Sequence, residues 1–248
     1  MALADPPGFF GKVPEVGAFV SRRLPQDFIQ PWDQWLQSAI SCSRDRLGQQ
    51  WLEVYLTSPI WRFALSPSLA GPDGWAGVLM PSVDRVGRYF PFTVTSKLPE
   101  SISLFELPRG DQRWFESAEA LALSALDDDA PTIDALDKAA LALGLPCAGN
   151  SATPASVVRR GVGWWLPASS GAGYADTLDR FVPKLAEQQF SASSIWWSMG
   201  SNSVEAGVAL CKGLPDVQGF TAMLAGSWQS CGWEDLSLGL PGEVENEP

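Results

Sequence analysis

Apolar residues along the chain follow two different spacings, and these predict alternating helices and strands. In the first strongly patterned segment they recur every three or four positions, at Phe28, Trp32, Leu36 and Ile40 among others. This spacing places them on one face of a helix, which then buries that face against a core. Gly48 follows this segment and is expected to end the helix.

Shorter runs that are dense in apolar and aromatic residues predict strands. The run at 60–65 contains Trp61 and Phe63, and two further runs lie at 75–82 and 92–96. Because helices and strands alternate, we expect an α/β fold, a three-layer αβα sandwich with a mixed β-sheet and helices on both faces. The other expected helices are 49–56, 111–126, 132–143, 176–189 and 216–225, and the other strands are 161–166, 194–198 and 206–211.

Adjacent tryptophans occur twice within expected strands, at Trp164–Trp165 and Trp196–Trp197. Neighbouring residues of a strand face opposite sides, so each pair is expected to place one ring on each face of the sheet. The alternative is that some rings face a partner protein, where Trp and Arg are favoured. We expect a single domain over 1–239, with a Gly/Ala/Ser/Pro-rich internal seam near 144–156, and a flexible acidic tail over 240–248.

The composition restricts the chemistry that the chain can perform. It has 248 residues and no histidine, which excludes sites that need an imidazole, among them the Ser-His-Asp and Cys-His nucleophile systems. The four cysteines lie too far apart for a CxxC motif, and the sequence contains no G-x-S-x-G and no Walker loop. We therefore expect a protein that is not an enzyme and that uses neither a cofactor nor a metal ion.

The net charge of −11 is concentrated in two segments without Lys or Arg, which we expect to be solvated faces. Segment 114–137 has seven acidic residues and segment 213–248 has six, so the rest of the chain has 15 acidic against 17 basic residues. Nucleic acids and anionic membranes need clustered Lys and Arg, so neither is expected as a partner. With no signal-peptide pattern and no apolar run of membrane-spanning length, we expect a cytoplasmic protein.

A polar turn between the expected strands 75–82 and 92–96 concentrates side chains that bind anions. Two arginines in one turn can hold a carboxylate or phosphate through paired hydrogen bonds. The structural alternative is that Asp84 pairs with Arg88 or Arg62 and pins the connection between the strands, and the sequence leaves both interpretations open. The candidate binding residues are Arg62, Ser82, Asp84, Arg85, Arg88 and Tyr89, together with Trp61.

Several segments, in this order along the chain, resemble one known family. They are Gly8-Phe9-Phe10-Gly11-Lys12-Val13-Pro14, Pro59-Ile60-Trp61-Arg62-Phe63-Ala64-Leu65 and Gly77-Val78-Leu79-Met80-Pro81-Ser82-Val83-Asp84-Arg85-Val86-Gly87-Arg88-Tyr89-Phe90-Pro91, with a weaker echo in Ser194-Ile195-Trp196-Trp197. Together they are similar to the TagF (ImpM) family of type VI secretion-associated proteins. The similarity is dense over roughly the first hundred residues.

The resemblance implies a cytoplasmic, non-catalytic accessory protein that acts after translation as a repressor of assembly or firing of the type VI secretion system. It implies a forkhead-associated scaffold protein as the partner, without nucleic acid or membrane insertion, and it leaves the oligomeric state open. A different class of function remains as an alternative, a phospho-ligand or small-molecule binding protein or a carboxylate-based hydrolase. That alternative would use the turn at Asp84, Arg85 and Arg88.

Overall fold

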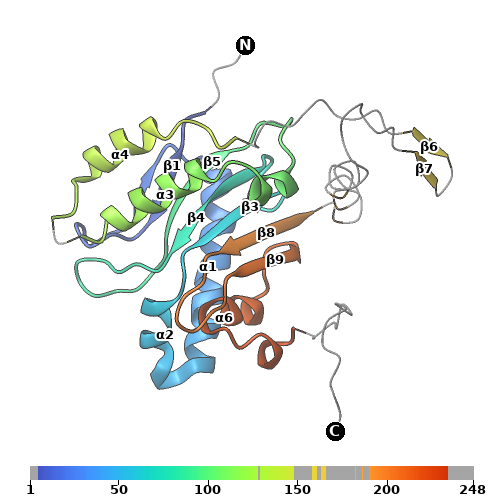
Figure 1. The fold of residues 1–248 in the computed structure, drawn as a ribbon. Helices are drawn as coiled ribbons and strands as arrows, with labels where there is room; N and C mark the ends of the chain where they lie inside the picture. Colours follow the sequence, from blue (N-terminus) through green and yellow to red (C-terminus); the bar gives the residue numbers. More distant parts are fainter. Residues whose placement is uncertain are drawn as a thin grey trace, which may run out of the picture.

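A single sheet of seven strands organises the molecule (Figure 1). The computed structural model describes residues 5–127, 129–147, 158–160, 163–165, 182, 186, 190 and 192–233. The strand order across the sheet is β2-β1-β5-β4-β3-β8-β9. In chain order these strands are β1 (Gly8–Gly11), β2 (Val20–Arg22), β3 (Trp61–Leu65), β4 (Trp75–Met80), β5 (Phe92–Lys97), β8 (Ser193–Ser198) and β9 (Gly207–Lys212).

Every strand pairing in this sheet is antiparallel, so the prediction of a mixed sheet is wrong. The reason lies in the connections. Strands β3, β4 and β5 are neighbours both in the chain and in the sheet, and short links join them end to end. A short link returns the chain in the opposite direction, whereas parallel neighbours need a long crossover between them. The helices therefore pack on the sheet without joining parallel strands.

Helices cover both faces of the sheet, which confirms the predicted sandwich (Figure 1). On one face lie α1 (Gln26–Leu47), α2 (Trp51–Thr57) and α6 (Val217–Ala225), and on the other lie α3 (Arg113–Ser124) and α4 (Ile133–Ala142). Gly48 ends α1 at a φ of 53°, as predicted. The 3-10 turns are η1 (Gly48–Gln50), η2 (Leu104–Arg109) and η3 (Gln229–Cys231).

Aromatic rings fill the core between α1 and the sheet. The Trp32 ring of α1 lies 4.9 Å from Phe63 of β3 and 6.1 Å from Trp196 of β8, measured between ring centroids. Such pairs contribute roughly 0.5–1.5 kcal/mol each beyond the area they bury. Trp197 faces the opposite side and contacts Phe115 of α3 at 4.8 Å. The pair in β8 therefore places one ring on each face, as predicted.

The first two strands were not predicted. The segment before residue 24 has no visible alternation, yet β1 is buried at every position and pairs with both β5 and β2. Residues 158–160 (β6, Val158–Arg160) and 163–165 (β7, Gly163–Trp165) form a separate antiparallel hairpin where one strand was expected at 161–166. None of the described helices has both the length and the apolar composition needed to cross a bilayer.

Several predictions concern parts of the chain that the structure does not describe. Residues 148–156 of the expected seam and the expected tail at 240–248 lie outside the described residues, as do the side chains of Trp164 and Trp165. Of the expected helix 176–189, only residues 182 and 186 are described, and both are helical. β3 precedes the expected seam in the chain and β8 follows it. The two strands nevertheless hydrogen-bond to each other in one sheet.

Candidate functional site

The polar turn between β4 and β5 is built around the carboxylate of Asp84, which is buried. One carboxylate oxygen, Oδ1, accepts hydrogen bonds from the backbone N–H groups of Val86 at 3.0 Å and Arg88 at 2.9 Å. Gly87 adopts a φ of 82°, a left-handed conformation that favours glycine. The side chain of Asp84 thus reinforces a tight turn whose backbone is already bonded, with the Gly87 N–H donating to the Asp84 carbonyl at 2.9 Å.

The second carboxylate oxygen of Asp84 binds two cations. Oδ2 accepts from Lys12 Nζ at 3.0 Å and from Arg88 Nε at 2.8 Å. Burial by itself raises the pKa of Asp84, but the hydrogen bonds from Arg88, Lys12 and Val86 outweigh it and hold this pKa well below 3.8, its ordinary value. With four donors on an ionised carboxylate, Asp84 has the surroundings of a structural anion and not of a proton acceptor.

Further hydrogen bonds fasten the turn to the loop that follows β1. Ser82 Oγ donates to the carbonyl of Lys12 at 2.7 Å, the Arg85 N–H donates to the carbonyl of Val16 at 3.2 Å, and Arg88 Nη2 donates to the carbonyl of Gly17. The Arg88 side chain nevertheless stays 58% exposed. The predicted Asp84–Arg88 pair is therefore present and pins the connection, while more than half of the Arg88 side chain remains open to solvent.

Tyr55 of α2 anchors the turn through hydrogen bonds to Ser82. Its hydroxyl donates to the carbonyl of Ser82 at 3.0 Å and accepts from the Ser82 N–H at 2.9 Å. The ring is fully buried, and this burial raises the pKa of Tyr55. One side chain thus bonds to both backbone groups of the buried Ser82, whose carbonyl also accepts from the Phe90 N–H at 3.1 Å.

Arg62 and Trp61 lie away from this turn, although they were predicted as members of the same site. The Arg62 guanidinium forms two hydrogen bonds with the carboxylate of Glu119 on α3, at 2.7 and 2.8 Å, and a third with Gln112 at 2.9 Å. Asp84 therefore pairs with Arg88 and Lys12 and not with Arg62. The indole of Trp61 donates to the carbonyl of Met223 at 3.1 Å, under α6.

Trp61 instead lines a pocket of about 380 Å³. Its ring meets Trp228 edge-on, with ring centroids 6.3 Å apart. This pocket lies beside the start of β9, at the end of the sheet, on a different side of β3 from the Arg62–Glu119 pair. The structure therefore divides the predicted site residues among three places.

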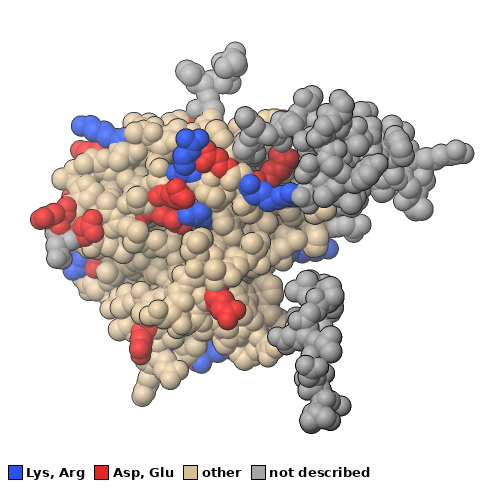
Figure 2. Space-filling view, viewed as in Figure 1, with Lys and Arg blue, Asp and Glu red and all other residues tan. Residues whose placement is uncertain are grey.

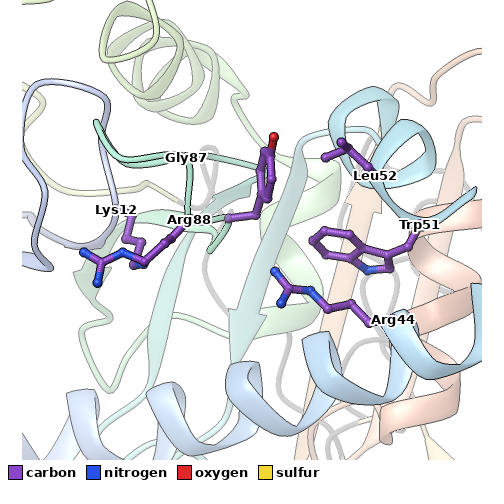
Figure 3. Close-up of a pocket in the computed structure, with 7 residues that line it drawn as sticks. Lys12, Arg44, Trp51, Leu52, Gly87 and Arg88 are labelled. Atoms are coloured by element: carbon purple, nitrogen blue, oxygen red, sulfur yellow. The ribbon is translucent and has the colours of Figure 1, made fainter. Parts of the chain in front are cut away.

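A pocket of about 560 Å³ opens beside the Asp84 turn (Figure 3). The carbon of the Arg44 guanidinium, on α1, lies 4.2 Å from the centre of the Trp51 ring. Figure 3 shows this pair on one side of the pocket and the neighbouring side chains of Lys12 and Arg88 on the other. The lining residues are Lys12, Arg44, Trp51, Leu52, Gly87, Arg88 and Tyr89.

The sequence analysis identified only part of this pocket. Arg88 and Tyr89 were candidate residues, whereas Lys12 appeared only within the family-like segment at the start of the chain. Arg44 and Trp51 belong to helical segments whose apolar spacing explained them as ordinary helix residues. Their only signal was an Arg and a Trp close to the end of a helical segment, a combination that many proteins share.

The acidic segment 114–137 is partly neutralised within the molecule, which changes the expectation of a purely solvated face. Glu119 pairs with Arg62, Asp137 with Arg23, and Asp134 with Arg22 at 3.9 Å. Figure 2 shows the result on the face that carries α3 and α4, where acidic and basic side chains are interspersed. Among the described residues, no group of three His, Cys, Asp or Glu side chains is arranged to hold a metal ion.

Comparison with known proteins identifies the family. Residues 8–143 match the TagF N-terminal domain, described as type VI secretion system-associated. This match covers more than half of the chain, so the protein belongs to the TagF family of type VI secretion-associated proteins, as the sequence motifs suggested.

A solved structure supports the assignment over nearly the whole chain. The protein is similar to PA0076 from Pseudomonas aeruginosa PAO1, with 39% sequence identity and a TM-score of 0.78. The similarity covers 96% of this chain and 99% of that chain. In the comparison with curated proteins, no sequence matches. The similarity to PA0076 therefore extends to the α/β sandwich beyond the segment matched by the family.

Proposed function

We propose that this protein is a non-catalytic repressor of the type VI secretion system. It acts in the cytoplasm, after translation, by binding a forkhead-associated scaffold protein and so restraining assembly or firing of the secretion machine. The observation that carries the proposal is membership of the TagF family across residues 8–143. The repressor role and the scaffold partner follow from the family resemblance.

The surroundings of Asp84 support binding over catalysis. Its carboxylate accepts four hydrogen bonds, and two of these come from cations. A general base needs a free lone pair and a pKa near the working pH, whereas the pKa of Asp84 is lowered. This argues against the alternative of a carboxylate-based hydrolase at this turn.

An exposed surface around the turn suits contact with a protein. Val86 is 64% exposed at the tip of the turn and Phe19 is 48% exposed, with its ring 4.8 Å from that of Phe90. Arg85 is also exposed, and exposed aromatic and Arg side chains are favoured in the centres of interfaces. We call the four residues Phe19, Arg85, Val86 and Arg88 the turn surface, and we propose that it contacts the scaffold.

The proposal is tested by co-purification. The full chain, carrying an affinity tag, should retain the forkhead-associated scaffold from an extract of its own bacterium, and deletion of the gene should increase effector secretion. If the wild-type chain does not retain the scaffold and deletion leaves secretion unchanged, the proposed function is wrong.

A matched pair of variants tests the surface. Val86→Asp introduces a charge on the turn surface and should weaken retention of the scaffold at least tenfold, because an unpaired charge in an interface core is costly to desolvate. Val208→Asp introduces the same charge at the same exposure, 64%, on β9, and should bind as wild type. Equal binding by both variants would exclude the turn surface as the contact.

A further inference from the structure

The pocket beside the Asp84 turn contains more positive charge than the protein itself neutralises. Three cations, Lys12, Arg44 and Arg88, line it, and none of the lining residues is acidic. Asp84 binds Lys12 and Arg88 from beneath and supplies a single negative charge. The pocket therefore carries an excess of about two positive charges, which favours an anion and disfavours a cation or a neutral ligand.

Donor groups remain available on these cations. Within the described part of the chain, the Arg44 guanidinium has no hydrogen-bond or ion-pair partner, and the same holds for Nη1 of Arg88. Lys12 gives one of its three N–H groups to Asp84. An ammonium has three donors and a guanidinium five, arranged in a planar fork. Several N–H groups that border this pocket therefore have no acceptor among the described residues.

The contact between Arg44 and Trp51 orients the guanidinium for binding. A guanidinium that stacks on an aromatic ring uses its face for the contact and keeps its N–H groups, which lie in its plane, free for hydrogen bonds. Trp51 is itself fixed, because its ring stacks on Tyr55 with centroids 4.8 Å apart and its indole donates to Ser43 at 2.8 Å. Arg44 is therefore held ready before any ligand arrives.

The size and walls of the pocket define the ligand further. Its volume of about 560 Å³ exceeds what an inorganic ion fills and lies in the range of small-molecule sites. Leu52, which is 40% exposed, and the half-buried ring of Tyr89 offer apolar contacts beside the cations. We propose that this pocket binds a phosphomonoester, with the phosphate between Arg44, Arg88 and Lys12 and an apolar group against Leu52 and Tyr89.

This inference does not depend on the proposed repressor function, since it concerns a ligand and not the scaffold. It is tested with the full chain at low ionic strength, by calorimetric titration with phenyl phosphate and, as the uncharged control, with phenol. Phenyl phosphate should give saturable binding and phenol none. Absence of saturable binding of phenyl phosphate at millimolar concentration would overturn the proposal.

Two substitutions on α1 provide the matched comparison. Arg44→Gln should weaken phenyl phosphate binding at least tenfold, because charge-assisted hydrogen bonds from a guanidinium are lost. Arg46→Gln removes the same charge two residues later, outside the pocket lining, and should bind within twofold of wild type. Both side chains are exposed, so the melting temperature serves as a check that both variants are folded. Equal affinity of the two variants would refute the assignment of Arg44.

A further titration distinguishes the source of the phosphate. The amide of N-acetyl-phosphotyrosine carries the same phenyl phosphate group on a peptide backbone. Tighter binding of this compound than of phenyl phosphate would indicate a phosphorylated protein segment as the natural ligand. Equal or weaker binding would indicate a small phosphorylated molecule, and both results support a phosphomonoester site.

Discussion

The ion pair between the buried Arg62 and the half-buried Glu119 links β3 to α3 and allows a quantitative test. Glu119→Ala removes the two carboxylate oxygens that lie 2.7 and 2.8 Å from the guanidinium. The Arg62 side chain is only 7% exposed, so water cannot replace them fully. Removal of one partner of a buried pair typically destabilises a protein by about 3–5 kcal/mol. Gln112 still accepts from Arg62, and we therefore expect a loss of about 3 kcal/mol.

The measurement is urea unfolding at neutral pH, followed by tryptophan fluorescence. Glu119→Ala should unfold at a lower urea concentration with an unchanged slope, and its melting temperature should fall by about 6–12 °C for a chain of this size. Glu116→Ala, at an exposed position one turn earlier on α3, is the control and should change the free energy of unfolding by less than about 0.5 kcal/mol.

The double variant Arg62→Met with Glu119→Leu tests whether the loss in Glu119→Ala comes from leaving the Arg62 charge unpaired. Replacing a buried ion pair by apolar side chains of similar size is often neutral or stabilising, so this variant should recover most of the stability lost in Glu119→Ala. If Glu119→Ala unfolds at the same urea concentration as Glu116→Ala, the pair contributes nothing and the reasoning is refuted.

Three further substitutions test the turn and the sheet. The pKa of Asp84 is lowered, so its ionised form stabilises the native state above pH 3.8, and the stability gap between wild type and Asp84→Asn should shrink as the pH falls below 3.8. A gap that widens at low pH, in urea unfolding, would contradict this. Tyr55→Phe leaves the buried Ser82 N–H without its partner, while the Ser82 carbonyl still accepts from the Phe90 N–H at 3.1 Å, and should cost about 1–3 kcal/mol in the same assay; a loss near zero would contradict it. Gly77→Ala would place a Cβ atom 2.3 Å from the carbonyl oxygen of Val94 and should cost about 3 kcal/mol. Its control is Gly207→Ala on β9, where a Cβ meets nothing within 4 Å, and equal melting temperatures would contradict the steric argument.

The sequence predicted the elements whose pattern is long or dense. The regular apolar spacing of α1 and the adjacent tryptophans of β8 needed no knowledge of their partners. Strands β1 and β2 have four and three residues, too few to show alternation. They are strands because β1 hydrogen-bonds to β5 and β2 hydrogen-bonds to β1. The antiparallel arrangement likewise depends on which strands meet, and interleaved helices alone do not determine it.

The candidate site was predictable to the extent that it is local. Asp84 and Arg88 lie four residues apart in one turn, and their pairing was one of the two interpretations of the sequence. Lys12 lies 72 residues from its partner Asp84, and Arg44 reaches the same pocket from α1, so only the fold brings them together. In the sequence Arg62 was an equally plausible partner for Asp84. It lies on the face of the sheet that carries α3, however, and pairs there with Glu119.

The position of β3 in the sheet has a consequence for truncated forms of the protein. β3 hydrogen-bonds on one side to β4, inside the family segment 8–143, and on the other side to β8, beyond it. A fragment that stops at residue 143 would turn β3, whose five residues are all buried, into an unpaired apolar edge. Such an edge recruits strands from other chains, so this fragment should aggregate. We therefore expect the cooperative folding unit to include β8 as well as the family segment 8–143.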